Sequence, residues 1–353
     1  MKITFRNATS SDFFAMKSLW ESTFKDPLDY VEMLFDNYIL ENNCIVAYDG
    51  SDLVANLIGI PYNFKYRDLN FNALYLCGLA TESLYRGKGI MGHMLEDITK
   101  KFSSENIDFL FLIPADTHLR DYYSRFGYYD TEQMKRLSYV CANKFQTIVS
   151  EIKILDKNLP LNVNGNQYVI FENYLDISAS LLKDIIDKCM REEAKDDTIH
   201  IYHTELDWKL IIRDKLSSER YLTVNITNLE DIFFIDPIKS EIEVVAGDDK
   251  HIDEIINSIS VLYIGSADHS NGVIPSNKDN SRRLRVRKEK YGMVKFNPKF
   301  LNKIAHYFKG SENPIFQEVN ENLKKYEKMN FQERHRIYSK IFARHIYFRF
   351  MLD

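Results

Sequence analysis

The spacing of apolar residues near the N-terminus first follows the period of a strand and then that of a helix. Residues 3–8 predict a short strand, and Thr9 or Ser10 can cap a helix over residues 11–24. Asp26-Pro27 predicts the start of a second helix, because proline is tolerated at the first helical position. The chain is therefore expected to begin with one strand and two helices.

Three strand-like runs come next. Residues 44–48 and 53–64 flank Asp49-Gly50, which is a strong signal for a hairpin turn. A further strand is expected over residues 71–80. This order predicts antiparallel strands followed by a β-turn-α-β unit, which is typical of an α/β fold with a mixed sheet.

A glycine-rich turn with two cations separates the last of these strands from a helix. The segment runs Arg86-Gly87-Lys88-Gly89-Ile90-Met91-Gly92, and helical spacing continues through Ile98. The amide groups at a helix N-terminus are unpaired, and the helix dipole favours negative charge there. Glycines let the backbone approach a phosphate closely. The turn is therefore a candidate anion site.

Two nucleotide motifs fit this segment poorly. The P-loop pattern G-x-x-x-x-G-K-[ST] is absent, whereas residues 87–92 do match G-x-G-x-x-G. The dinucleotide fold places that motif in its first βα turn, and here several strand-like runs precede it.

Four pieces of sequence occur in an order that resembles the GNAT N-acetyltransferases. That family has a strand, [RQ]-x-x-G-x-[GA] opening a helix, a second strand, and a helix with an aromatic-Tyr pair before Gly-aromatic. Met91 departs from the Gly or Ala of commoner members. With the form Arg125-Phe126-Gly127-Tyr128 and a long C-terminal extension, the chain resembles the enhanced-intracellular-survival (Eis) branch. The four pieces are 79–81, 86–91, 109–113 and 122–128.

The resemblance implies a GNAT fold for residues 1–145, a catalytic domain that binds acetyl-CoA. A second strand-turn-helix pattern around Gly247 predicts a degenerate GNAT-like domain over residues 146–290. Its turn carries Asp248 and Asp249, and carboxylates repel a pyrophosphate, so no CoA is expected there.

The last segment, residues 291–353, is expected to be helical with a packed terminus. Asn330 and Glu333 form a capping box before a predicted helix over 331–345. The apolar end, residues 346–353, is unlike a frayed tail and is expected to be tied into the fold.

The GNAT resemblance also assigns roles to residues. The backbone of Leu79, Ala80 and Thr81 would pair with the amide arm of CoA like an added strand. Tyr123 matches the tyrosine that protonates the leaving thiolate. The pyrophosphate would lie on Arg86, Gly87, Lys88, Gly89, Ile90, Met91 and Gly92.

The catalytic base is open at this stage. The Eis resemblance suggests the α-carboxylate of Asp353, and an apolar terminus would raise its pKa by desolvation. Glu82, directly after the cofactor strand, and a water molecule are the alternatives. His93 and His118 are interpreted as structural.

The expected function is transfer of an acetyl group from acetyl-CoA to a primary amine. Aminoglycosides, polyamines, peptide lysines and amino sugars all stay open as acceptors. A non-catalytic acyl-CoA-binding or regulatory protein is the alternative. The basic run 282–290 could bind nucleic acid, but its alternation more simply describes a strand with one cationic face for an interdomain or homo-oligomer contact.

The amino-acid composition excludes several classes of protein. The chain has 353 residues, 45% of them hydrophobic, and a net charge of −5, so no global attraction to nucleic acid or anionic membranes is expected. No run has the length of a membrane span, and no signal-peptide core is seen. The four cysteines lack metal-ligand spacing and are expected to be reduced thiols. These features predict a cytoplasmic protein that needs no metal.

Overall fold

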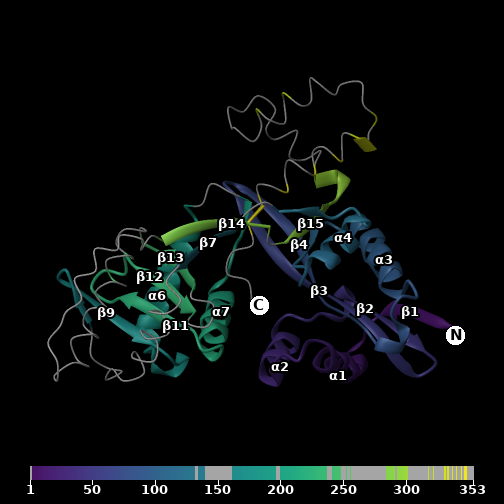
Figure 1. Cartoon of the computed structure of the whole chain (residues 1–353), viewed down its shortest axis with the longest axis horizontal. Coiled ribbons are helices and arrows are strands. Elements are labelled where there is room, and N and C mark those ends of the chain that lie inside the picture. The colour runs from purple at the N-terminus through teal and green to yellow at the C-terminus, as the bar shows by residue number, and fades with distance from the viewer. Residues whose placement is uncertain are drawn as a thin grey trace, which may run out of the picture. The chain divides into compact units, whose positions relative to one another are not determined.

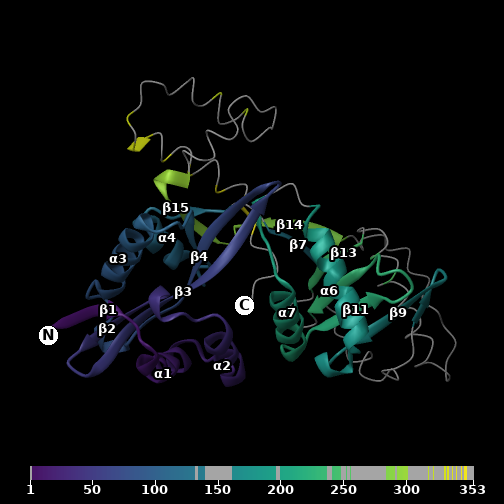
Figure 2. The same ribbon diagram turned by 180° about the vertical axis from the view of Figure 1, so that it is seen from behind.

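The chain folds into two compact units, which are shown in Figures 1 and 2. Unit 1 contains residues 1–133, 197–202 and 290–349, and unit 2 contains 134–196, 203–289 and 350–353. The computed structural model describes residues 2–131, 134–139, 161–195, 199–236, 241–247, 252, 255, 284–290, 292–300, 317, 321, 330, 332–333, 336, 339, 343 and 346–347.

Unit 1 is built on a mixed sheet with the strand order β1-β2-β3-β4-β5-β15-β6. Most neighbouring pairs are antiparallel, whereas β4 and β5 run parallel. The expected hairpin is confirmed, with Gly50 at φ 64° in the turn between β2 and β3. The strands are Ile3–Asn7 (β1), Cys44–Asp49 (β2), Asp52–Tyr66 (β3), Leu69–Thr81 (β4), Phe109–Leu112 (β5), Tyr129–Asp130 (β6) and Met293–Phe296 (β15).

Helices cover both faces of this sheet (Figures 1 and 2). Leu74 and Leu76 of β4 pack against α3 and α4, because alternate residues of a strand point to the same face. On the other face α1 packs on β3 and β4. Pro27 is the N-cap of α2 rather than its first residue. The helices are Phe13–Phe24 (α1), Leu28–Asn37 (α2), Ile90–Ser104 (α3) and Thr117–Ser124 (α4).

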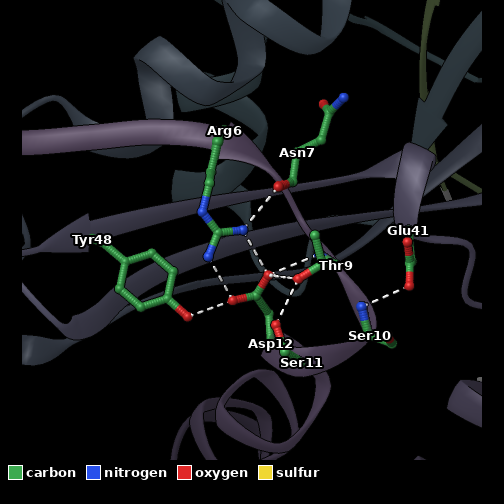
Figure 3. Close-up of polar contacts among 8 residues, drawn as sticks. All are labelled: Arg6, Asn7, Thr9, Ser10, Ser11, Asp12, Glu41 and Tyr48. Atoms are coloured by element: carbon green, nitrogen blue, oxygen red, sulfur yellow. Dashed lines mark hydrogen bonds and ion pairs between the residues drawn. The ribbon is translucent and has the colours of Figure 1, made fainter.

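A buried carboxylate ties the start of α1 to the first two strands (Figure 3). Asp12, 3% exposed, accepts hydrogen bonds from Arg6, from the Tyr48 hydroxyl at 2.7 Å and from the Thr9 backbone at 2.7 Å. The bonds from Arg6 are the main reason that the pKa of Asp12 lies well below its usual range. The carboxylate thus joins β1, β2 and the short 3-10 turn Ser10–Asp12 (η1).

Unit 2 contains a sheet in which every strand pair is antiparallel, in the order β14-β7-β13-β12-β11-β9-β8. Its core includes Tyr168, Phe233 and Ile235. Two helices accompany the sheet, Ala179–Glu193 (α6) and Glu205–Ser217 (α7). The strands are Met134–Tyr139 (β7), Leu161–Val163 (β8), Asn166–Phe171 (β9), Tyr221–Asn225 (β11), Ile232–Asp236 (β12), Glu241–Ala246 (β13) and Leu284–Glu289 (β14).

Several strands pair outside the segment to which the sequence assigned them. β7 was expected in the first domain but pairs with β13 and β14 in unit 2. β15, in the segment expected to be helical, joins the sheet of unit 1 between β5 and β6. A strand's alternation specifies its buried face but not its partner, so these pairings could not be foreseen.

Two further short strands belong to the sheet of unit 1. β10, Ile199–Ile201, lies between α6 and α7 and pairs with the outer part of β3 and with β16, Ile346–Tyr347. The domain limits 1–145, 146–290 and 291–353 stay a prediction. None of the described helices has the length and apolar character needed to cross a membrane.

Candidate functional site

Near its C-terminal end, β4 departs from regular strand pairing in two ways. β4 pairs with β3 along its length, but with β5 only through Ala73, Leu74 and Tyr75. The register with β3 also shifts, because Asn56 is opposite Ala80 while Ile58 is opposite Cys77. This β-bulge gives β4 one extra residue beside Gly78, which has φ 54°.

Beyond Tyr75, the edge of β4 that faces β5 has no strand partner among the described residues. No described strand pairs with residues 76–81 on the side that faces β5. These residues include Leu79, Ala80 and Thr81, which the sequence predicts for the amide arm of CoA. An open edge with unpaired backbone groups can take an extended, peptide-like ligand as an added strand.

The glycine-rich turn follows this edge directly. Gly87 and Gly89 have φ values of 73° and 80°, and a Cβ at either position would meet no atom within 4 Å. Gly89 is the N-cap of α3, so the first amides of this 15-residue helix lack intrahelical partners. The turn therefore combines open space with unpaired donors.

Two exposed cations lie in the same turn. Arg86 Nε donates a hydrogen bond to the carbonyl of Thr81 at 3.0 Å, which connects the turn to the end of β4. Lys88 Nζ lies 4.7 Å from the centroid of the Tyr85 ring, and the Tyr85 hydroxyl donates to Asp49 at 3.1 Å. Charge and helix dipole together favour a phosphate-bearing ligand.

Three further residues assigned to the pyrophosphate, Ile90, Met91 and Gly92, also take part in packing. The Ile90 side chain is buried in the core, and Met91 packs against the same cluster. A Cβ at Gly92 would lie 3.0 Å from Cζ of Phe126, so the absence of a side chain lets α3 approach the segment after α4 closely. For these three residues only the backbone is a candidate for contact with a ligand.

Tyr123 is buried on α4 and belongs to the core cluster against which Leu79 packs. Its side chain is 6% exposed, and its ring contacts Tyr122 and Tyr128 at centroid distances of 5.4 and 6.1 Å. Burial is the main cause that raises its pKa, and the charge of Asp116 adds to the effect. The phenol is therefore protonated at neutral pH and can act as a proton donor.

An ion-pair network that the sequence did not reveal anchors α4. Arg120, one turn before Tyr123, donates to Asp130 of β6 at 2.8 Å and to the carbonyl of Lys290 at 2.7 Å. Lys290 Nζ lies 2.7 Å from the same carboxylate. The partners are 10 and 170 residues from Arg120 in sequence, so no local pattern could identify them.

The candidate bases and histidines are dispersed. Glu82 is exposed, and its backbone N–H donates to Val54. His93 lies 3.1 Å from Asp97 on α3, whereas His118, expected on a loop, is an exposed residue of α4. Asp353 lies outside the described residues, as do Asp248 and Asp249.

The described residues include no group of three His, Cys, Asp or Glu side chains arranged to hold a metal ion. Within the same part of the chain, the cysteines are free thiols in buried positions, namely Cys44, Cys77 and Cys189.

Comparison with known proteins agrees with this architecture. Residues 4–130 match the model of the acetyltransferase (GNAT) domain family. No curated protein matches the sequence. Among solved structures, a protein of Enterococcus faecalis described as a probable N-acyltransferase is 13% identical with a TM-score of 0.54; the match covers 86% of this chain and 75% of that one.

A GCN5-related N-acetyltransferase from Kribbella flavida is 10% identical with a TM-score of 0.53, over 85% of this chain and 72% of that one. One from Anabaena variabilis is 13% identical with a TM-score of 0.51, over 84% and 73%. At such identities the likeness shows a shared fold. Residues 4–130 thus match the acetyltransferase (GNAT) domain family, and the fold of the chain agrees with that of these structures.

Proposed function

We propose that this chain transfers an acetyl group from acetyl-CoA to a primary amine. The observation that carries the proposal is the open edge of β4 at residues 76–81, which continues directly into a glycine-rich helix start. The edge suits the amide arm of CoA, and the helix start suits its pyrophosphate. Both parts of one cofactor would thus bind to consecutive segments of the chain.

In this proposal Leu79, Ala80 and Thr81 hold the amide arm through backbone hydrogen bonds. The pyrophosphate lies on the backbone of residues 86–92, with Arg86 and Lys88 adding charge. Acetyl-CoA is the acyl donor, and no metal takes part. The thioester then lies beside the end of β4, near the core cluster that contains Tyr123.

Acyl transfer begins with a neutral amine, whose nitrogen attacks the thioester carbonyl. A carbon–nitrogen bond forms, and the tetrahedral oxyanion is stabilised by backbone N–H donors. The carbon–sulfur bond then breaks as Tyr123 gives its proton to the departing sulfur. The amine loses one proton to a base, and the products are an amide and free CoA thiol.

We assign the base to the α-carboxylate of Asp353, with Glu82 and a water molecule as alternatives. The resemblance to the Eis branch supports this assignment, and Asp353 itself lies outside the described residues.

Further features of the proposal follow the Eis-like resemblance. Unit 2 would be a degenerate GNAT-like domain that binds no CoA, because of Asp248 and Asp249. The acceptor stays open among aminoglycosides, polyamines, peptide lysines and amino sugars. Buried free thiols at Cys44, Cys77 and Cys189 fit the reducing cytoplasm.

The test is an amine panel with acetyl-CoA, in which released CoA thiol is detected and the acetylated amine is identified by mass spectrometry. Calorimetry of the intact chain should give about one acetyl-CoA site per chain. Binding without thiol release from any amine class would favour a non-catalytic acyl-CoA-binding protein. Two equal sites would contradict the assignment of unit 2.

A further inference from the structure

A side chain of β3 holds the bulge of β4 in place. Asn56 Nδ2 donates a hydrogen bond to the carbonyl of Gly78 at 2.6 Å, and both residues are buried. The bulge interrupts the regular ladder between these strands, so a side-chain amide here supplies a donor where the backbone register has shifted. This bond fixes the orientation of the peptide that immediately precedes Leu79.

The other side of the bulge is closed by a tryptophan. A Cβ at Gly78 would lie 2.5 Å from Cζ3 of Trp20, so the indole occupies the space that a side chain would need. The indole is itself held, because Trp20 Nε1 donates to Asp26 at 2.8 Å. Packing by Trp20 and hydrogen bonding by Asn56 together leave the bulge little freedom.

Asn56 carries a cost in stability. It is 0% exposed, and its Oδ1 atom finds no hydrogen-bond partner among the described residues. A buried acceptor without a partner destabilises the fold, because its desolvation is not compensated by a hydrogen bond. The amide cannot turn over to relieve this, because Oδ1 would then face the Gly78 carbonyl. A residue retained against such a cost is a candidate for a functional role.

We propose that Asn56 is a positioning residue for acetyl transfer. It holds the β4 bulge in the conformation that aligns the backbone of residues 79–81 with the amide arm of acetyl-CoA, and the arm in turn places the thioester. This inference rests on the proposed function, because the backbone it aligns is the one assigned to acetyl-CoA. Asn56 itself touches neither substrate, and it acts through Gly78.

The test compares wild type with Asn56→Leu, which keeps a similar volume and loses the donor. Stability should change little, because an unpartnered Gly78 carbonyl replaces an unpartnered Oδ1. Turnover should fall about 10- to 100-fold, since small misplacement near reacting atoms has effects of this order. The Kd for acetyl-CoA should rise by no more than about threefold, because the proposed pyrophosphate contacts at residues 86–92 do not depend on Asn56.

Thr223→Val is the matched control. Thr223 is also fully buried, and its side-chain oxygen has no hydrogen-bond partner in the described part of the chain, but it belongs to β11 of unit 2. This variant should leave turnover unchanged. An Asn56→Leu enzyme with wild-type turnover would overturn the inference, and so would a loss of turnover that merely follows a large loss of stability.

Amide hydrogen exchange separates this inference from the proposed function. In Asn56→Leu, exchange should rise in peptides that cover residues 76–82 and stay unchanged in the strands of unit 2. Unchanged exchange at the bulge would contradict the positioning role whatever the activity. Faster exchange at the bulge in a chain that acetylates no amine would instead refute the catalytic function.

Discussion

Arg6 and Asp12 are joined by two parallel hydrogen bonds, of 2.6 and 2.7 Å, between the guanidinium nitrogens and the two carboxylate oxygens. The arginine side chain is about half exposed, whereas the carboxylate is buried. The pair connects β1 to the turn before α1 (Figure 3). Helix α1 in turn carries Trp20, which packs on the β4 bulge. A structural ion pair thus supports the face of the sheet opposite α3.

Asp12→Ala should lower the free energy of unfolding by about 2–3 kcal/mol. The change leaves donors of Arg6, Thr9 and Tyr48 without their common acceptor, and the loss is moderated because Arg6 reaches solvent. Urea unfolding at neutral pH measures this change in the free energy of unfolding. Asp36→Ala, an exposed position on α2, is the control and should change stability by less than about 0.5 kcal/mol.

The same carboxylate should make stability depend on pH in the acid range. The pKa of Asp12 is lower in the folded state than in the unfolded state, so its contribution is complete above the unfolded value of about 3.9. It is lost as pH falls from there through the folded pKa. The stability difference between wild type and Asp12→Asn should therefore shrink below about pH 4. A difference that is constant from pH 7 to pH 3 would contradict this.

Gly89→Asp should abolish acetyl-CoA binding while the fold stays intact by circular dichroism. The substitution puts a carboxylate at the start of α3, where the pyrophosphate is proposed to lie, and strains a position with φ 80°. Calorimetry reads the affinity. Gly50→Asp is the matched control, because Gly50 also has positive φ and open surroundings but lies in the β2–β3 turn. Equal losses of acetyl-CoA affinity in both variants would contradict the assignment of residues 86–92 to the pyrophosphate.

Tyr123→Phe should lower kcat by roughly 10²–10⁴-fold and leave the affinity for acetyl-CoA nearly unchanged, because only the proton donor is removed. Steady-state kinetics with the best amine of the panel measures this. Tyr128→Phe provides the comparison, since that hydroxyl is buried and has no partner within the described residues. Unchanged turnover in Tyr123→Phe would make Tyr123 a packing residue.

A C-terminal tag should impair turnover far more than cofactor binding, whereas an N-terminal tag should have little effect. Each residue added after Asp353 displaces the α-carboxylate by about 3.5 Å, which is too far for proton transfer. Asp353→Asn retains the α-carboxylate and should be mild. Full activity of the C-terminally tagged enzyme would transfer the role of base to Glu82 or a water molecule.

The sequence by itself determined the features that depend on neighbouring residues. Asp49-Gly50 specified a hairpin because glycine tolerates positive φ, and the helical spacing from Ile90 to Ile98 specified α3. The glycines before that helix predicted a turn at its start, and Gly87 and Gly89 have positive φ there. These signals depend only on residues close together in sequence, so they can be recognised without knowing the rest of the fold.

Tertiary structure decided which strands pair and what surrounds the bulge. The partners of β7 and β15 lie up to about 190 residues away in sequence, and β15 falls in a segment that was expected to be helical. Neither Asn56 nor Trp20 belongs to a recognisable sequence motif. From the sequence, Asn56 is a polar residue within a strand, and Trp20 is an apolar residue on the buried face of a helix. Their roles arise because a register shift brings both against Gly78, and a register shift is a property of paired strands rather than of either strand alone.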